Sequence, residues 1–247
     1  MRTIAGLMIC VSGAVYAQPA AAPRFEVASV KPTPADQYNG SSGVTTRHDR
    51  LTANRVTLKR CIMGAYGVGP NQVVGGPPWL DSDRFEIAAK ADHLVDNDAV
   101  FMAMLQTLMA ERFKLAIHRE TRTMEALVLE VARNGLKLEK AEGGDSNTDS
   151  SHGRIDARAT DMSLFAQLLS RAMAVPVVNE TGLDGAFNFK LEWSADADKP
   201  VKPGENAADS GPSIFTALQQ QLGLRLQARK TPVDVLVIDH AERPSEN

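Results

Sequence analysis

A short sequence motif occurs twice in this chain, about a hundred residues apart. Residues 48–53 read HDRLTA, and residues 152–157 read HGRIDA. Each copy is followed by an apolar run with helical spacing, a strand around an aromatic residue, a second helix and a closing apolar strand. Because a repeat of this length requires similar supersecondary structure in each copy, we expect two tandem homologous halves.

Each half is expected to contain two helix–strand–strand units. Apolar residues at every third or fourth position predict helices over 57–66, 99–112, 162–173 and 214–222, with Asp96 or Asp98 as the cap of the second helix. Alternating residues predict strands over 24–30, 44–52, 85–90, 113–118, 126–131, 176–178, 186–193, 224–226 and 233–238. Helices with one apolar stripe pack on sheets with one buried face, which gives a layered α+β fold on antiparallel or mixed sheets.

Three details of this scheme are specific enough to be checked. Strand 126–131 is expected to pair antiparallel with strand 113–118, its neighbour in the chain. Superposing Leu58 on Leu164 requires a two-residue gap between the halves. Residues 67–78 hold four Gly and three Pro, so we expect no regular element there.

The N-terminus has the pattern of a secretory signal peptide. Arg2 is followed by an apolar stretch from Ile4 to Val15, and Val15-Tyr16-Ala17 fits a signal-peptidase site. We expect a signal peptide over 1–17, with cleavage up to residue 23 possible. The domain boundaries then follow as a first half over 24–140, a linker over 141–151 and a second half over 152–247 with a mobile polar loop over 194–211. Export would place the mature protein in the periplasm or outside the cell.

Composition excludes some classes of partner. The net charge is −3, and Lys and Arg are scattered, whereas nucleic-acid binding needs a concentrated cationic face. Aromatic residues make up 5%, too few to form a stacking platform for single strands. No apolar run after the signal peptide is long enough for a stable membrane span. Cys10 would leave with the signal peptide, so Cys61 is expected to be a buried free thiol.

Two segments are weak candidates for a binding site. His118-Arg119-Glu120 lies on a predicted strand, where His118 and Glu120 share a face and could serve acid–base chemistry or form a solvated ion pair. Trp79 follows a Gly-Gly-Pro-Pro turn and is either a binding surface or a packing plug. The sequence has no Gly-x-Ser-x-Gly, His-x-x-x-His or Cys-x-x-Cys spacing, so we expect no catalytic residue, metal or cofactor.

Several motifs in order resemble a known bacterial family. They are FEVASVKP at 25–32, ERFKL at 111–115 with HRE at 118–120, PVV at 176–178 before TGLDG at 181–185, QLGL at 221–224 and VID at 237–239. Together these look like the soil-associated secreted family, a domain of unknown function expanded in soil bacteria. The resemblance implies an exported protein but no reaction. Some relatives carry the domain beside membrane-embedded peptidase modules, which suits a sensory or ligand-binding role.

A weaker resemblance concerns single units of the chain. Residues 162–193 and 214–238 are similar to the N-terminal modules of secretins and TonB-dependent receptors, which bind partner proteins. This similarity rests on one helix, one turn and two strands, so it is an analogy at the level of the fold.

Two functional hypotheses remain open from the sequence. The first is a binding or interaction module for a protein, peptide or cell-envelope ligand, which would dock on sheet edges or between the halves. The second is a cell-envelope hydrolase that uses His118 and Glu120 in a cleft between halves. We favour the first, because no convergent catalytic set accompanies the repeat.

Overall fold

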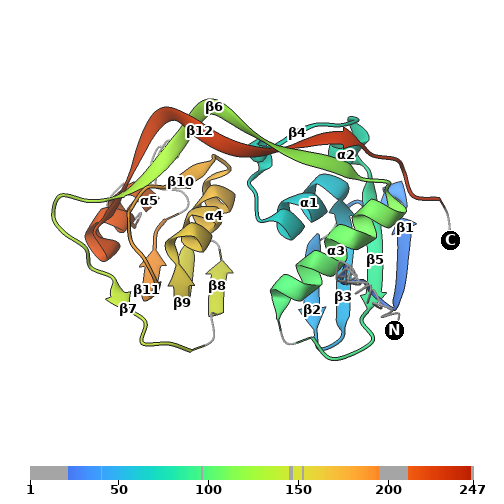
Figure 1. Ribbon diagram of the computed structural model, residues 1–247, viewed down its shortest axis with the longest axis horizontal. Helices are drawn as coiled ribbons and strands as arrows, with labels where there is room; N and C mark the ends of the chain where they lie inside the picture. The colour runs from blue at the N-terminus through green and yellow to red at the C-terminus, as the bar shows by residue number, and fades with distance from the viewer. Residues whose placement is uncertain are drawn as a thin grey trace, which may run out of the picture.

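The chain forms two lobes joined by one long twisted ribbon (Figure 1). The structure is a computed structural model and describes residues 22–39, 41–95, 97–144, 147–151, 153–194 and 211–245. The predicted α+β class is confirmed, with three sheets that are mostly antiparallel. The predicted signal peptide lies outside the described residues.

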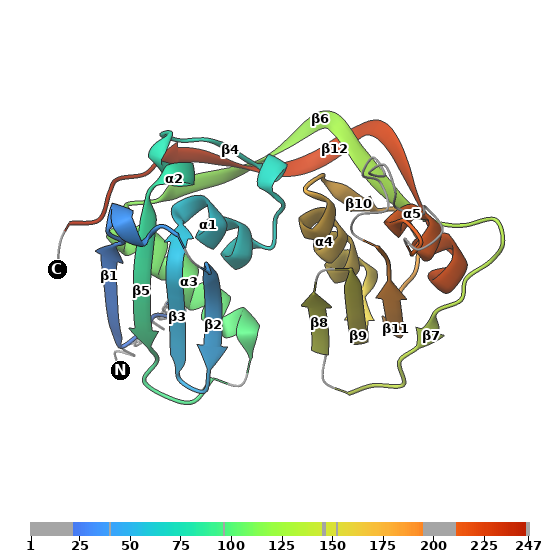
Figure 2. The ribbon, with the colours of Figure 1, turned by 180° about the vertical axis from the view of Figure 1, so that it is seen from behind.

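The N-terminal lobe is a four-stranded sheet in the order β1-β5-β3-β2, covered on one face by helices (Figure 2). Its elements are β1 (Val27–Pro32), η1 (Ala35–Gln37), β2 (Gly43–Arg47), β3 (Arg50–Thr57), α1 (Leu58–Tyr66), η2 (Pro70–Gln72), α2 (Trp79–Ser82), β5 (Arg84–Lys90) and α3 (Asp98–Arg112). Along β3 and β5 every second side chain is buried, and these side chains share one core with α1 and α3. No helix of the described residues lies on the other face of the sheet.

The C-terminal lobe repeats this order of elements in a sheet β7-β11-β9-β8. Its elements are β7 (Glu139–Lys140), β8 (Asn147–Ser151), β9 (Arg154–Asp161), α4 (Met162–Met173), β11 (Ala186–Glu192), α5 (Ile214–Ala217) and the π-helix η3 (Leu218–Leu222). A second core joins α4, α5 and η3 to this sheet. The expected linker 141–151 is therefore wrong in part, since 147–151 forms β8, an edge strand of this lobe. Residues 195–210 of the expected mobile loop lie outside the described part of the chain.

The passage from hairpin to helix is built in the same way in both lobes. Thr57 caps α1 by accepting a hydrogen bond from the Arg60 N–H, and Asp161 caps α4 by accepting one from Leu164. Each strand before the cap contains a bulge with a left-handed residue. The Arg55 N–H donates to Glu86 Oε1 at 3.1 Å, and the Ala159 N–H donates to Asn188 Oδ1 at 2.9 Å.

These shared details change the alignment of the two lobes. Leu58 and Met162 are each the first residue after the helix cap, so the expected two-residue gap is wrong. The cap of α3 is Asn97, which accepts from the Ala99 N–H, and not Asp98, which is the first helical residue. Asp96 lies outside the described residues. The homology of the halves as such stays a prediction.

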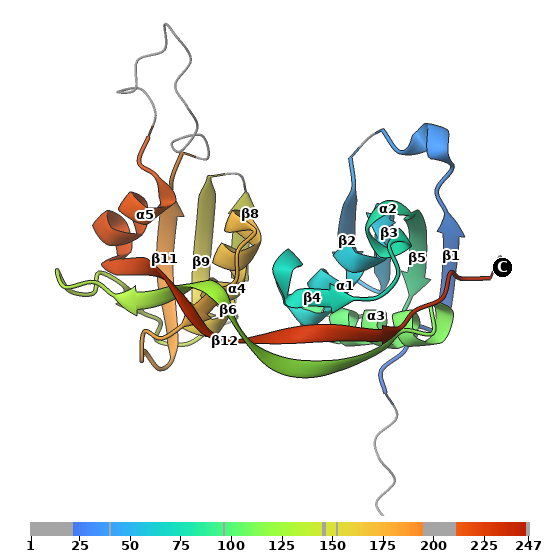
Figure 3. The ribbon, with the colours of Figure 1, turned by 90° about the horizontal axis from the view of Figure 1, so that it is seen from above.

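The ribbon consists of β6 (Ala116–Val131) and β12 (Leu224–His240), which pair antiparallel over nearly their whole length (Figure 3). Two short strands complete its sheet in the order β10-β6-β12-β4, and both pair in parallel. The strand β4 (Val73–Gly75) pairs with the end of β12, and β10 (Val177–Asn179) pairs with the end of β6. Each long strand therefore starts in its own lobe and ends in the other.

Strand exchange joins the two cores. Leu236 and Ile238, near the C-terminus, belong to the core of the N-terminal lobe. Leu129, from the first half of the sequence, belongs to the core of the C-terminal lobe. Neither core is complete without a strand from the other half of the sequence.

The expected pairing of 113–118 with 126–131 is wrong, because residues 116–118 and 126–131 lie in the single strand β6, which pairs with β12. No turn residue separates them, and the intervening residues 119–125, Arg-Glu-Thr-Arg-Thr-Met-Glu, continue the strand. The two predicted closing strands are likewise one strand, with Pro232 inside it. Pro232 lies opposite Thr123 at the middle of the ribbon, where β12 has only one neighbouring strand, so its missing N–H costs no ladder bond.

A direct contact also fixes one lobe against the other. The segment 67–78 was expected to hold no regular element, but it contains both η2 and β4. Asn71 Nδ2 donates to the carbonyl of Ala174 after α4 at 3.0 Å. Gly67 is left-handed, and a Cβ there would lie 2.7 Å from Gln167 Oε1, so glycine permits this close approach. Across the described ranges, no helix combines the length and apolar character that a membrane span requires.

Candidate interaction sites

The predicted pair His118 and Glu120 belongs to a cluster at the end of the ribbon that lies in the N-terminal lobe. We define the His118 cluster as His118, Glu120, Arg122 and Asp239. His118 Nδ1 lies 2.9 Å from both carboxylate oxygens of Asp239 on β12, and Nε2 lies 3.0 Å from Glu120 Oε1. Arg122 donates from Nε to Glu120 Oε2 at 2.8 Å. Asp239 was missed as a partner because it is far from His118 in the sequence.

The electrostatics of this cluster are those of an exposed ion-pair chain. The hydrogen bond that His118 donates to Asp239, then the one that it donates to Glu120, raises the pKa of His118 above its usual value. The bonds from His118 and Arg122 lower the pKa of Glu120. Both imidazole nitrogens are engaged, so neither is left to accept a proton from a substrate. This geometry favours a structural role for the pair over the hydrolase hypothesis.

The other two predicted residues lie elsewhere. Arg119 points to the other face of β6, where its cross-strand neighbour is the buried Leu236. Burial raises the pKa of Tyr66, and the positive charge of Arg119 partly offsets this rise. Trp79 stacks on Phe113 with ring centroids 6.4 Å apart, and the Arg243 guanidinium lies 5.4 Å from its ring. Trp79 is thus packed into the edge of the core, and the structure does not join it to the His118 cluster.

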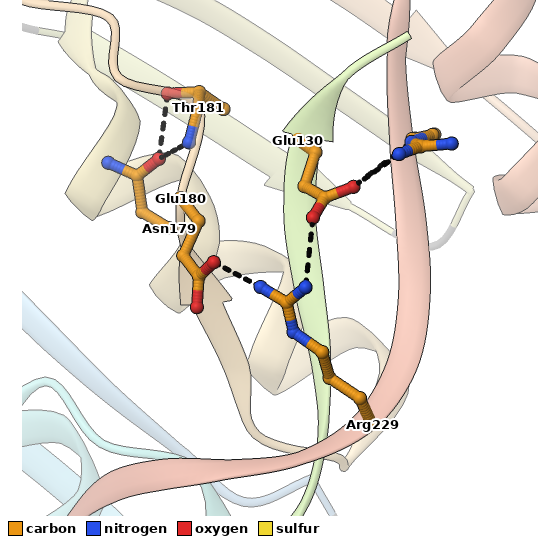
Figure 4. A network of polar contacts seen from close by, with 6 residues as sticks. Glu130, Asn179, Glu180, Thr181 and Arg229 are labelled. Atoms are coloured by element: carbon orange, nitrogen blue, oxygen red, sulfur yellow. Dashed lines mark hydrogen bonds and ion pairs between the residues drawn. The ribbon is translucent and has the colours of Figure 1, made fainter.

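The opposite end of the ribbon carries a second polar cluster that the sequence reading missed. We define the Glu130 cluster as Glu130, Glu180, Arg225 and Arg229 (Figure 4). Arg225 Nη2 lies 2.7 Å from Glu130 Oε2, and Arg229 Nη1 lies 3.2 Å from Glu130 Oε1. Arg229 also binds Glu180, which follows β10. The four-residue spacing of Arg225 and Arg229, which places both on one face of a strand, was the available signal.

Within the described part of the chain, Arg225 of the Glu130 cluster lines an open surface hollow. Three surface hollows have volumes of about 360 to 570 Å³, and neither His118 nor Trp79 lines any of them. Within the described ranges, no group of three or more His, Cys, Asp or Glu side chains is arranged to hold a metal ion. Cys61 is buried in the N-terminal core, and burial raises the pKa of its thiol to about 12, so the thiolate nucleophile does not form at neutral pH.

Two unpaired sheet edges are the clearest features open to a partner. The strands β2 and β8 each have one neighbour, and they lie on the sides of the lobes that face each other, as all three ribbon views show (Figures 1 to 3). Arg47 pairs with Arg50, and Ser151 with Arg154, across two-residue turns. In such hairpins alternate residues point their N–H and C=O groups away from the partner strand. These residues are Val44 and Thr46 in β2, and Thr148 and Ser150 in β8.

The outer edges of the two lobe sheets are protected. The strand β1 ends in Lys31 and Pro32, residues that discourage strand addition. Beside β11, where β7 is only two residues long, the Gln221 side chain accepts from the Glu192 N–H at 3.0 Å and donates to its carbonyl at 2.8 Å. In contrast, β2 and β8 contain no Lys, Pro or bulge, and no backbone bond to them outside their hairpins occurs within the described residues.

The described residues form an α+β protein with exchanged strands and two unpaired sheet edges. Residues 59–241 match the family described as Protein of unknown function (DUF3738). The chain belongs to this family, which confirms the predicted domain of unknown function. No curated protein and no solved structure matches the chain.

Proposed function

We propose that this protein is an exported binding module that recognises an extended segment of a partner polypeptide by strand addition. The observation that carries the proposal is the pair of unpaired, unprotected edges, β2 and β8, at equivalent places in the two lobes. An added strand satisfies the outward N–H and C=O groups of the edge with main-chain hydrogen bonds, which supply affinity with little dependence on sequence. The signal-peptide pattern at 1–17 supports export.

The frame of the molecule supports this role. A docking edge has to keep its position when a partner binds, since ordering a mobile edge reduces affinity. Here the exchanged strands and the contact of Asn71 with Ala174 hold the lobes at two separate points. The two edges are therefore presented by lobes that are linked at two places.

Proline variants test the proposal on the intact chain. A library of random 12-residue peptides displayed on phage would be selected against the wild-type protein. Val44→Pro and Thr148→Pro each remove one outward N–H, and the matched controls Val44→Ala and Thr148→Ala keep it. We expect selected peptides to protect the amides of Thr46 or Ser150 from hydrogen exchange and to lose at least ~10-fold in affinity with proline but not with alanine.

Equal unfolding midpoints for each Pro and Ala pair would show that any loss of affinity is local. Selected peptides that bind the proline variants as tightly as wild type would overturn strand addition. Hydrolysis of a selected peptide, abolished in His118→Ala with Glu120→Ala, would instead support the hydrolase hypothesis.

A further inference from the structure

The two free edges carry opposite charge, although they occupy equivalent places. On β2 the residue at the turn is Arg47, and on β8 the residue at the same place is Ser151. Two residues before Arg47, β2 has Thr45, and at the equivalent place, two residues before Ser151, β8 has Asp149. Because strand addition places partner side chains directly beside these residues, the two edges select different partners.

The charge of the β2 edge belongs to a row of cations across the bare face of the N-terminal sheet. Arg47 lies opposite Arg50, which lies opposite Lys90, so the three side chains share one face. Asp49 lies 3.8 Å from Arg50 Nε and 3.8 Å from Lys90 Nζ, and partly neutralises both. The side chain of Arg47, at the open end of the row, makes no hydrogen bond or ion pair within the described residues.

The inner face of β2 offers apolar contact. Val44 lies opposite the buried Ala53 and is 37% exposed at the rim of the core. Thr46, on the same face, donates to Asp98 Oδ1 at 2.9 Å and is already satisfied. An apolar partner side chain beside Val44 would complete the rim, because burying apolar surface is favourable.

We propose that β2 takes an antiparallel segment with an acidic residue beside Arg47 and an apolar residue three positions later beside Val44. The inference rests on the proposed function, and the antiparallel direction follows from the more stable ladder. At β8 the preferred charge of the partner residue is reversed. Asp149 lies opposite Asp156, and this pair of carboxylates favours a basic partner residue. The partner at β2 is thus a polypeptide with an acidic-x-x-apolar strand.

Three capped peptides test this chemistry. The first is Thr-Thr-Asp-Thr-Thr-Val-Thr-Thr, the second replaces Asp by Lys, and the third reverses the order of Asp and Val. The dissociation constant and the positions of shifted backbone amides would be measured by NMR at low salt. We expect the first peptide to shift Val44 and Thr46 and to bind ~2- to 5-fold more tightly than the second or the third.

The variant Arg47→Ser gives β2 the residue of β8 and should remove the preference for Asp over Lys. Its matched control, Ser151→Arg, should leave the preference at β2 unchanged. If all three peptides shift β2 equally, strand addition stands and the charge and order assignment is overturned. If none shifts β2 or β8, the proposed function fails and this inference fails with it.

Discussion

The two ends of the ribbon have the same architecture but different polar chemistry. Glu130 follows the three residues of β6 that pair with β10, and Asp239 follows the three residues of β12 that pair with β4. At one end the carboxylate of Glu130 is 18% exposed and is held by two arginines. At the other end Asp239 is 47% exposed and is held by His118. Each end thus places a carboxylate beside a basic side chain, and the two ends differ in the burial of the carboxylate and in the kind of base that binds it.

The largest expected effect tests whether the two ends are equivalent in packing. Leu129 and Ile238 are each the last residue paired with a short parallel strand, and each is buried in the lobe of the other half. We expect Leu129→Ala and Ile238→Ala each to lower the free energy of unfolding by about 2–5 kcal/mol. Urea unfolding followed by circular dichroism should show one transition shifted in both variants, because the cores share strands. Two transitions, of which only one moves in each variant, would refute the coupling.

A smaller effect should separate the two ends by their polar clusters. Glu130→Gln removes the charge that Arg225 and Arg229 bind at a mostly buried position, and we expect a loss of about 1–3 kcal/mol. Asp239→Asn acts at a half-exposed position, where solvent screening limits the loss to about 1 kcal/mol or less. The same urea titration measures both. A greater loss for Asp239→Asn would invert the comparison.

The smallest effect is a pH dependence at one end only. The folded state raises the pKa of His118, so its contribution to stability is fully present below the unfolded pKa of about 6.5 and is lost as the pH rises through the higher folded value. The pKa of Glu120 is lowered, so its contribution is lost as the pH falls below about 4.5. His118→Gln should therefore destabilise the protein more at pH 5.5 than at pH 8.5. Unfolding midpoints at the two pH values check this, and Arg229→Gln, at the other end, is the control that should show no such difference.

Local elements of the fold were predictable from the sequence, and the long-range pairing was not. The helix α1 begins one residue after the predicted start because Thr57 is its cap, and the alternation in β5 and β11 marks their buried faces. The pairing of β6 with β12 depends on residues far apart in the chain. Nearest-neighbour reasoning favours a hairpin between 113–118 and 126–131, and only the absence of a turn signal between them argues against it.

The candidate sites show the same limit. Periodicity along one strand placed His118 and Glu120 on one face, and the structure brings them together. Asp239 and Glu130 could not be assigned, since their partners are set by the register between β6 and β12. The β2 and β8 edges are defined by the absence of a second neighbouring strand, and no local sequence pattern predicts such an absence.

The exchange of strands also has a consequence for synthesis. A chain leaves the ribosome from its N-terminus, so residues 27–112 emerge long before Leu236 and Ile238. The N-terminal lobe cannot close its core until Leu236 and Ile238 have been made, so the folding of this lobe waits for the second strand of the ribbon. Contacts such as that between Val73 and Leu236 span most of the sequence, which favours slow folding and a long-lived unfolded chain during synthesis.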